Sequence, residues 1–191
     1  MSRPSDTMRR IVVVGSSCAG KTTFAAQLAD RLSSPFVQLD ELHWGPDWTP
    51  ADEGDLRRNV DEATAEQRWV VDGNYVHLRD LTWRRADTLI WLNYSFFTVF
   101  GRALWRTVSR VVWRTRIYSG NRESFRLSFM SRDSILLWVI KSYSTRRLEI
   151  PALLAEPKFA DLQVLEFKTP GQARRFLRGT FATAGPRRAN Q

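Results

Sequence analysis

The sequence predicts one α/β domain built on a parallel β-sheet that is flanked by helices. Short apolar runs, typical of buried strands, alternate with stretches whose apolar residues recur at helical spacing. The runs are continuously apolar, as expected where helices cover both faces of a parallel sheet. The length of 191 residues is enough for one hydrophobic core and short for two ordinary domains.

Five strands are expected, each ending at polar residues or a turn. They cover residues 11–14, 36–39, 69–71, 88–92 and 162–167. The first helix follows Lys21 and stops before Pro35, and a second begins with Thr49 as its cap and Pro50 in its first turn. A long helix runs from Phe96 with one predicted apolar face, made of Phe96, Phe100, Leu104, Val108 and Val111. Another begins near residue 131 or 133, the last covers 172–181, and residues 185–191 read as a disordered tail.

The loop after the first strand matches G-x-x-x-x-G-K-[ST], the phosphate-binding P-loop. Its residues are Gly15, Ser16, Ser17, Cys18, Ala19, Gly20, Lys21 and Thr22. Glycines allow main-chain N–H groups to point at a phosphate, and the helix that follows adds its unpaired N-terminal donors. By this motif Lys21 reaches the β- and γ-phosphates and Thr22 binds magnesium, while Thr23 is placed near the α-phosphate. We therefore expect bound ATP and Mg²⁺.

Two carboxylates follow predicted strands and point to the same edge of the sheet. Asp40 ends the second strand and Asp72 ends the third. One could hold the waters of a magnesium ion and the other could orient an acceptor hydroxyl, as a kinase requires. The alternative is that either is a helix or turn cap, and Asp72 before Gly73 is the more turn-like.

The net charge of +9 is concentrated between residues 102 and 147. Arg102, Arg106, Arg110 and Arg114 recur every four residues, which places them in one row on a helix. Because like charges in a row repel one another, an anion is expected on that face, and a triphosphate is one candidate. A solvated face without a ligand and a nucleic-acid surface are the alternatives.

The composition excludes several kinds of site. One cysteine allows no internal disulfide, so a cytoplasmic location is expected. Two isolated histidines and that cysteine offer no metal-ligand cluster. No apolar run is long enough to span a bilayer, so no membrane association is expected.

Over about residues 10–180 the chain resembles a bacterial family of small P-loop kinase-like proteins. These are described as adenylate kinase-like or as DNA topology modulation protein FlaR-related. The resemblance rests on residues 15–23, 39–44 (Leu-Asp-Glu-Leu-His-Trp), 70–75 (Val-Val-Asp-Gly-Asn-Tyr), 85–88, 120–124 and 132–136. It implies a nucleoside-monophosphate-kinase-like fold with five parallel strands in the order 2-3-1-4-5, flanked by helices and carrying a lid.

The resemblance also implies site roles. Asp72 would be the magnesium carboxylate beside the P-loop, and Asp40 would lie one strand further out, toward the acceptor. An acceptor arm would span about residues 44–68, with Trp44 and Arg57 among its substrate residues, and Asn74 is placed with them. A basic lid at about residues 110–132 would bring Arg122 or Arg126 over the phosphates. Arg146 would bind phosphate after the lid, and Thr169 with Pro170 would touch the adenine.

The arm departs from true adenylate kinases, since it shows no monophosphate-binding pattern. Trp44 and Trp48 make it aromatic, which suits either a non-nucleotide acceptor or ordinary packing. The expected function is transfer of the ATP γ-phosphoryl group to a small acceptor, a nucleotide or another small molecule. The alternative is an ATP-binding regulator associated with nucleic acid, which the positive charge favours.

Overall fold

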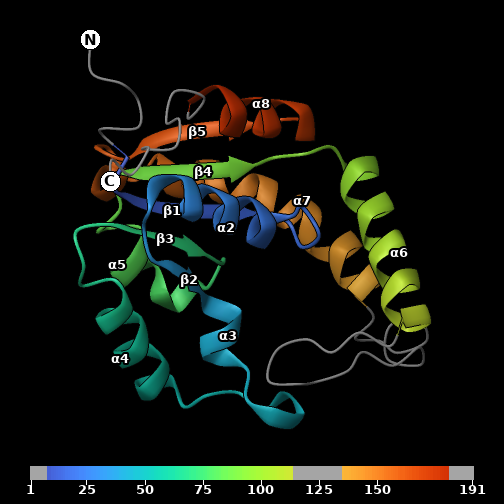
Figure 1. Ribbon diagram of the computed structural model, residues 1–191, viewed down its shortest axis with the longest axis horizontal. Coiled ribbons are helices and arrows are strands. Elements are labelled where there is room, and N and C mark those ends of the chain that lie inside the picture. Colours follow the sequence, from blue (N-terminus) through green and yellow to red (C-terminus); the bar gives the residue numbers. More distant parts are fainter. Residues whose placement is uncertain (1–7, 114–134, 181–191) are drawn as a thin grey trace, which may run out of the picture.

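The computed structural model describes residues 8–113 and 135–180, and its centre is one parallel sheet (Figure 1). The five strands lie in the order β2-β3-β1-β4-β5, which confirms the predicted order. All four neighbouring pairs are parallel. The strands are β1 (Arg10–Gly15), β2 (Phe36–Gln38), β3 (Trp69–Asp72), β4 (Thr88–Leu92) and β5 (Gln163–Phe167).

Helices connect the strands and cover the sheet. They are α2 (Lys21–Leu32), α3 (Leu39–His43), α4 (Glu53–Ala63), α5 (Arg79–Thr82), α6 (Phe96–Trp113), α7 (Ile135–Leu154) and α8 (Pro170–Thr180). Single 3₁₀ turns lie at η1 (Pro46–Trp48), η2 (Val76–Leu78) and η5 (Pro157–Phe159). The strand arrows point toward α6, which stands beyond their C-terminal ends (Figure 1).

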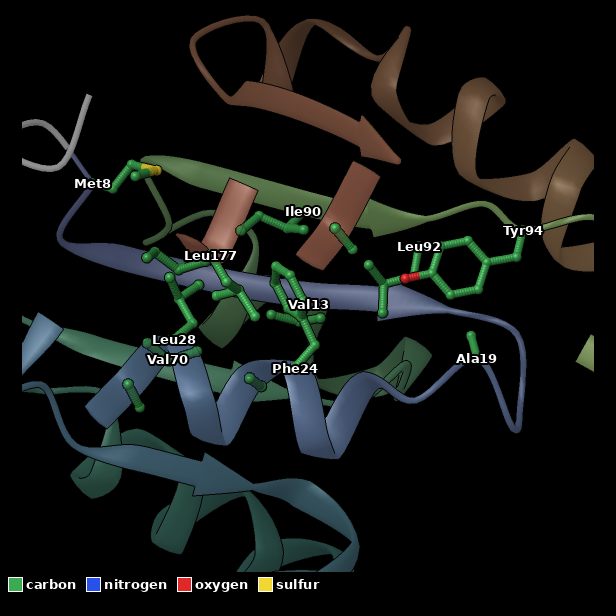
Figure 2. Close-up of a cluster of buried hydrophobic side chains, with 14 of the residues drawn as sticks. Met8, Val13, Ala19, Phe24, Leu28, Val70, Ile90, Leu92, Tyr94 and Leu177 are labelled. Atoms are coloured by element: carbon green, nitrogen blue, oxygen red, sulfur yellow. The ribbon is translucent and has the colours of Figure 1, made fainter. Parts of the chain in front are cut away.

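Both faces of the inner strands β1, β3 and β4 are buried, as their continuous apolar runs predict, whereas the residues of the edge strand β5 are exposed or half-buried. Ile11 and Val13 of β1 belong to one core cluster, which α2 and α8 cover with Leu28 and Leu177 (Figure 2). Val12 of β1 belongs to the other cluster, with side chains from α4, α7 and the η5 turn. Successive strand residues face opposite sides, so a strand covered on both sides needs apolar residues throughout.

Two helix predictions were wrong in detail. The helix expected from Thr49 begins at Glu53, because Asp52 is the cap and accepts hydrogen bonds from two main-chain N–H groups. Among the side chains of α6 that are described, Val99 and Ala103 are buried, whereas Leu104 is 42% exposed. The predicted face was therefore offset around the helix, although Phe96 does pack against the core. The side chains of Val108 and Val111 lie outside the described residues.

Other predicted segments are only partly described. Residues 114–134, which hold most of the predicted lid, and the predicted tail at 185–191 lie outside the described residues. The start predicted for the next helix, near 131 or 133, lies outside them too, and α7 is described from Ile135. Among the residues described, no helix combines the length and the apolar character needed to cross a membrane.

Asp87 joins three strands at the N-terminal edge of the sheet, through its carboxylate and through its main chain. The main-chain N–H groups of Arg9 and Arg10 donate to the carboxylate of Asp87, at 3.2 and 2.8 Å. The N–H of Asp87 donates to the carbonyl of Arg10, and the N–H of Gln163 donates to the carbonyl of Asp87. This clamp ties β1, β4 and β5 together at the edge opposite the P-loop.

Candidate active site

The P-loop runs from the end of β1 into α2, and its backbone turns through conformations that favour glycine. Gly15 has φ 148° and Gly20 has φ 86°. A Cβ atom on Gly15 would lie 2.7 Å from the carbonyl oxygen of Leu92, so a side chain cannot fit there. Gly20 caps α2 without a side-chain hydrogen bond, which leaves the first N–H groups of the helix for an anion.

Lys21 lies over this loop. Its ammonium donates to the carbonyl of Ser16 at 3.3 Å, so the cation lies beside the concave main chain. An ammonium beside a helix N-terminus is the arrangement by which P-loops bind a polyphosphate, so this loop is a candidate phosphate site.

Asp72 and Thr22 form the polar centre of the site. The Thr22 hydroxyl donates to Oδ2 of Asp72 at 2.5 Å. Asp72 is 3% exposed, and its Oδ1 atom is buried and has no hydrogen-bond partner among the residues described. Burial raises the pKa of Asp72, and the nearby Lys21 ammonium and the Thr22 hydroxyl oppose this rise.

These oxygens fit a magnesium ion that takes few protein ligands. A buried carboxylate oxygen without a partner and a neighbouring hydroxyl are the hard donors that Mg²⁺ prefers. The described residues contain no group of three or more histidines, cysteines, aspartates or glutamates that could hold a metal alone. Such an ion would therefore complete its shell with phosphate oxygens and water, as is usual for Mg²⁺.

Asn74 lies against the P-loop, whereas the sequence had placed it with the substrate residues. Its amide nitrogen donates to the carbonyl of Gly15 at 2.5 Å, and its amide oxygen accepts from the N–H of Gly15 at 3.3 Å. The pair holds both polar groups of the first P-loop residue, so we expect Asn74 to position the loop. The sequence could have indicated this contact, because the predicted strand order puts the end of strand three beside Gly15.

Asp40 faces the same cavity from α3. The hydroxyl of Tyr75 donates to Oδ1 of Asp40 at 2.8 Å, and this fixes the orientation of the carboxylate. Tyr75 belongs to a motif that the sequence analysis quoted, but it was assigned no role there.

One cavity of about 950 Å³ connects these groups. A volume of this size accommodates a nucleotide with a small second molecule. Besides P-loop residues, the lining includes Asp40, Trp44, Trp48, Asp72, Tyr94, Arg102, Arg106, Pro170 and Arg174. The sequence had singled out most of these positions, and Tyr94 and Arg174 are additions from the structure.

Two arginines of the predicted row line the cavity. Arg102 donates to the carbonyl of Ala19 in the P-loop at 2.6 Å, and its guanidinium lies 5.3 Å from the ring of Tyr94. Arg106 has a buried Nε atom without a hydrogen-bond partner in the part of the chain described. The side chain of Arg110, and all of Arg114, Arg122 and Arg126, lie outside the described residues.

Three other predicted residues do not line the cavity. Arg57 forms an ion pair with Asp80, and Arg146 forms one with Glu149. The Thr169 hydroxyl accepts from the N–H of Gln172 at the start of α8, whereas Pro170, which was predicted together with Thr169, does line the cavity.

The comparisons with known proteins concern the fold. A shikimate kinase from Bacteroides thetaiotaomicron superposes with a TM-score of 0.52, with 18% identity over 90% of this chain and 96% of that one. The chain has the fold of a P-loop kinase. A gluconokinase from Sinorhizobium meliloti 1021 gives 0.49, with 18% identity over 92% of this chain and 91% of that one.

Comparisons at the level of sequence found no relatives. No family model matches the chain, and no curated protein matches it. The resemblance to the FlaR-related family therefore stays a prediction, and the site must be interpreted from its own geometry.

Proposed function

We propose that the protein is an ATP-dependent phosphotransferase that transfers the γ-phosphoryl group to a hydroxyl of a small acceptor. The observation that carries this proposal is that Asp40 and Asp72 line one cavity together with the P-loop. A P-loop with one carboxylate is sufficient to bind a magnesium nucleotide. A second carboxylate, Asp40, is held by the hydroxyl of Tyr75. It supplies the group that orients an acceptor hydroxyl and accepts its proton.

On the phosphate side, the chain would provide donors and an oriented carboxylate. The P-loop N–H groups and the Lys21 ammonium bind the phosphate oxygens and stabilise the charge that develops on them. Thr22 and Asp72 would hold magnesium, whose chemistry when bound is to neutralise charge on the β- and γ-phosphate oxygens. Arg102 and Arg106 add positive charge from α6.

On the acceptor side, Asp40 would bind the acceptor hydroxyl and accept its proton. The hydrogen bond from Tyr75 keeps the carboxylate oriented before the acceptor arrives, which lowers the entropy cost of alignment. Arg122 or Arg126 of the predicted lid would close over the phosphates and exclude water. Arg57 and Arg146 have no role in this mechanism, since both are paired with carboxylates elsewhere.

The test is an ADP-release assay with Mg-ATP across nucleotides, sugars and small alcohols. We expect acceptor-dependent ADP formation in the native protein. Lys21→Ala should lose nucleotide binding and turnover, whereas Asp40→Asn should keep Mg-ATP binding and lose acceptor-dependent turnover. The proposal fails if no acceptor raises ADP formation above basal hydrolysis.

A second candidate is an ATP-binding regulator that contacts nucleic acid. The net charge of +9 and the arginine row favour it. Against it, Arg102 and Arg106 line the nucleotide cavity instead of forming a separate outer surface. Electrostatic binding to DNA should weaken steeply with salt, so absence of binding at about 50 mM salt removes this candidate.

A further inference from the structure

The segment after α3 is a small closed hairpin of residues 44–50. Trp44 and Pro50 form an antiparallel bridge, and just outside it the N–H of Ala51 donates to the carbonyl of His43 at 2.8 Å. Inside it, the N–H of Gly45 donates to the carbonyl of Thr49 at 2.8 Å. Because its own hydrogen bonds close the loop, the hairpin presents its side chains from a defined backbone.

The tip of this hairpin adopts an unfavourable backbone conformation. Asp47 has φ 54° and Trp48 has φ 58°, so two successive residues with side chains lie in the left-handed region. A bulky residue such as tryptophan rarely adopts this conformation, and strain of this kind clusters at ligand sites. The strain at Trp48 therefore makes this residue a candidate for a ligand contact.

Trp48 and Trp44 both line the cavity that Asp40 lines. Their rings are 5.8 Å apart at 78°, and the ring of Trp44 packs edge-on against His43 at 4.5 Å. His43 in turn contacts Tyr75, at 5.2 Å, whose hydroxyl holds Asp40. The two indoles and the carboxylate are thus supported by one chain of ring contacts.

Charge is distributed unevenly around the cavity. Within the described residues, the cationic side chains of the lining are Lys21, Arg102, Arg106 and Arg174, which come from α2, α6 and α8. The lining contributed by α3 and the hairpin consists of Asp40, Trp44 and Trp48. A negatively charged acceptor would find a carboxylate there, whereas the apolar face of a ring would find two indoles.

We propose that the acceptor is a hydroxylated ring without a negative charge, a sugar or a cyclic polyol, that stacks on one of the two indoles of Trp44 and Trp48, contacts the other, and places one hydroxyl at Asp40. This rests on the proposed phosphotransferase function. The acceptor oxygen forms a bond to the γ-phosphorus as the bond to the bridging oxygen breaks. The electron pair of that bond leaves with ADP, and the hydroxyl proton passes to Asp40.

The first measurement is binding, which requires no turnover. Saturation-transfer NMR is recorded with Mg²⁺, a non-hydrolysable ATP analogue and a broad panel of monosaccharides, aminosugars and cyclic polyols. Each ring is matched by an acidic counterpart, such as glucose by glucuronate, and by an open-chain polyol such as sorbitol. We expect saturation of ring C–H protons for at least one ring without an acidic group, and weaker signals for its acidic and open-chain counterparts.

The informative variant is Trp48→Asn, because asparagine tolerates the left-handed conformation that tryptophan does not. We expect ring affinity to fall at least about tenfold, the value of one good aromatic contact, without a fall in the melting temperature. Trp48→Gly is a second variant that suits the same φ. Trp105→Ala, which removes a tryptophan that is 74% exposed on α6, should change neither property.

The outcomes separate the two proposals. Ring binding that depends on Trp48, without ADP formation from any ring, supports the ring site and contradicts the phosphotransferase. ADP formation with only an anionic acceptor supports the phosphotransferase and overturns the ring site. The ring site is also overturned if no ring on the panel binds, or if Trp48→Asn lowers the melting temperature and leaves ring affinity unchanged.

Discussion

Replacing Asn74 by alanine tests how the P-loop is held. The variant removes two hydrogen bonds to Gly15, both in a partly buried place. At a net value of roughly 0.5–1.5 kcal/mol each, the native state should lose about 1–3 kcal/mol of stability. If ordering Gly15 is also required for nucleotide binding, the same free energy weakens Mg-ATP binding by about 5- to 150-fold.

The assay is urea unfolding together with calorimetry of Mg-ATP, and KM values for ATP and acceptor once an acceptor is known. Asn93→Ala is the matched control, since Asn93 follows β4 at the same edge and its amide nitrogen donates to Glu166 instead of the P-loop. That variant should lose stability and keep its affinity for Mg-ATP. If Asn74→Ala raises the acceptor KM alone and leaves Mg-ATP binding unchanged, Asn74 is a substrate residue and the positioning role is wrong.

Three further predictions concern charge and packing. Burial raises the pKa of Asp72, so the native state gains stability from its proton below the unfolded value near 4 and loses it as the pH rises through the folded pKa. Asp72→Asn should therefore raise the melting temperature of the nucleotide-free protein by a few degrees at pH 7. Adding Mg-ATP should no longer change the melting temperature of this variant. An unchanged or lower melting temperature of the nucleotide-free variant contradicts the prediction. Gly73→Ala places a Cβ atom 2.8 Å from Leu39 at a residue with φ 150°. Calorimetry should show that the free energy of unfolding falls by about 1–3 kcal/mol. Burial raises the pKa of Glu149, but the hydrogen bond and charge of Arg79 outweigh it and hold that pKa below its usual value. This stabilisation is present at neutral pH and is lost as the pH falls through the folded pKa, so Glu149→Gln should cost about 1–2 kcal/mol at pH 7 and less below pH 3.

Much of the sheet could be predicted because its inner strands are apolar on both faces. The bounds of β4 match the prediction, while Leu39 begins α3 instead of ending β2. The five residues of α3 make little more than one turn, which is too short for helical periodicity to appear in the sequence. In α6 two apolar rows compete, and tertiary contacts chose Val99 and Ala103 over the row with Leu104.

The part of the candidate site that belongs to a motif of known chemistry could be predicted from the sequence. Lys21, Thr22 and Asp72 come together because the strand order puts β3 beside β1. Contacts made by long side chains left no such pattern. Neither Tyr75 on Asp40 nor Asp80 on Arg57 can be deduced from spacing, because each pair forms between separate loops or helices in the folded chain.

The clamp at Asp87 separates two kinds of mutational effect along the strands. The carboxylate partners of Asp87, Arg9 and Arg10, and its main-chain partner Gln163 lie at the edge of the sheet opposite Asp40 and Asp72, which we propose as catalytic. Substituting Asp87 should lower the yield of folded protein while each surviving molecule works at the normal rate. A selection for expression would therefore remove substitutions at the N-terminal edge of the sheet. A selection for turnover would remove substitutions at the C-terminal edge of the same sheet.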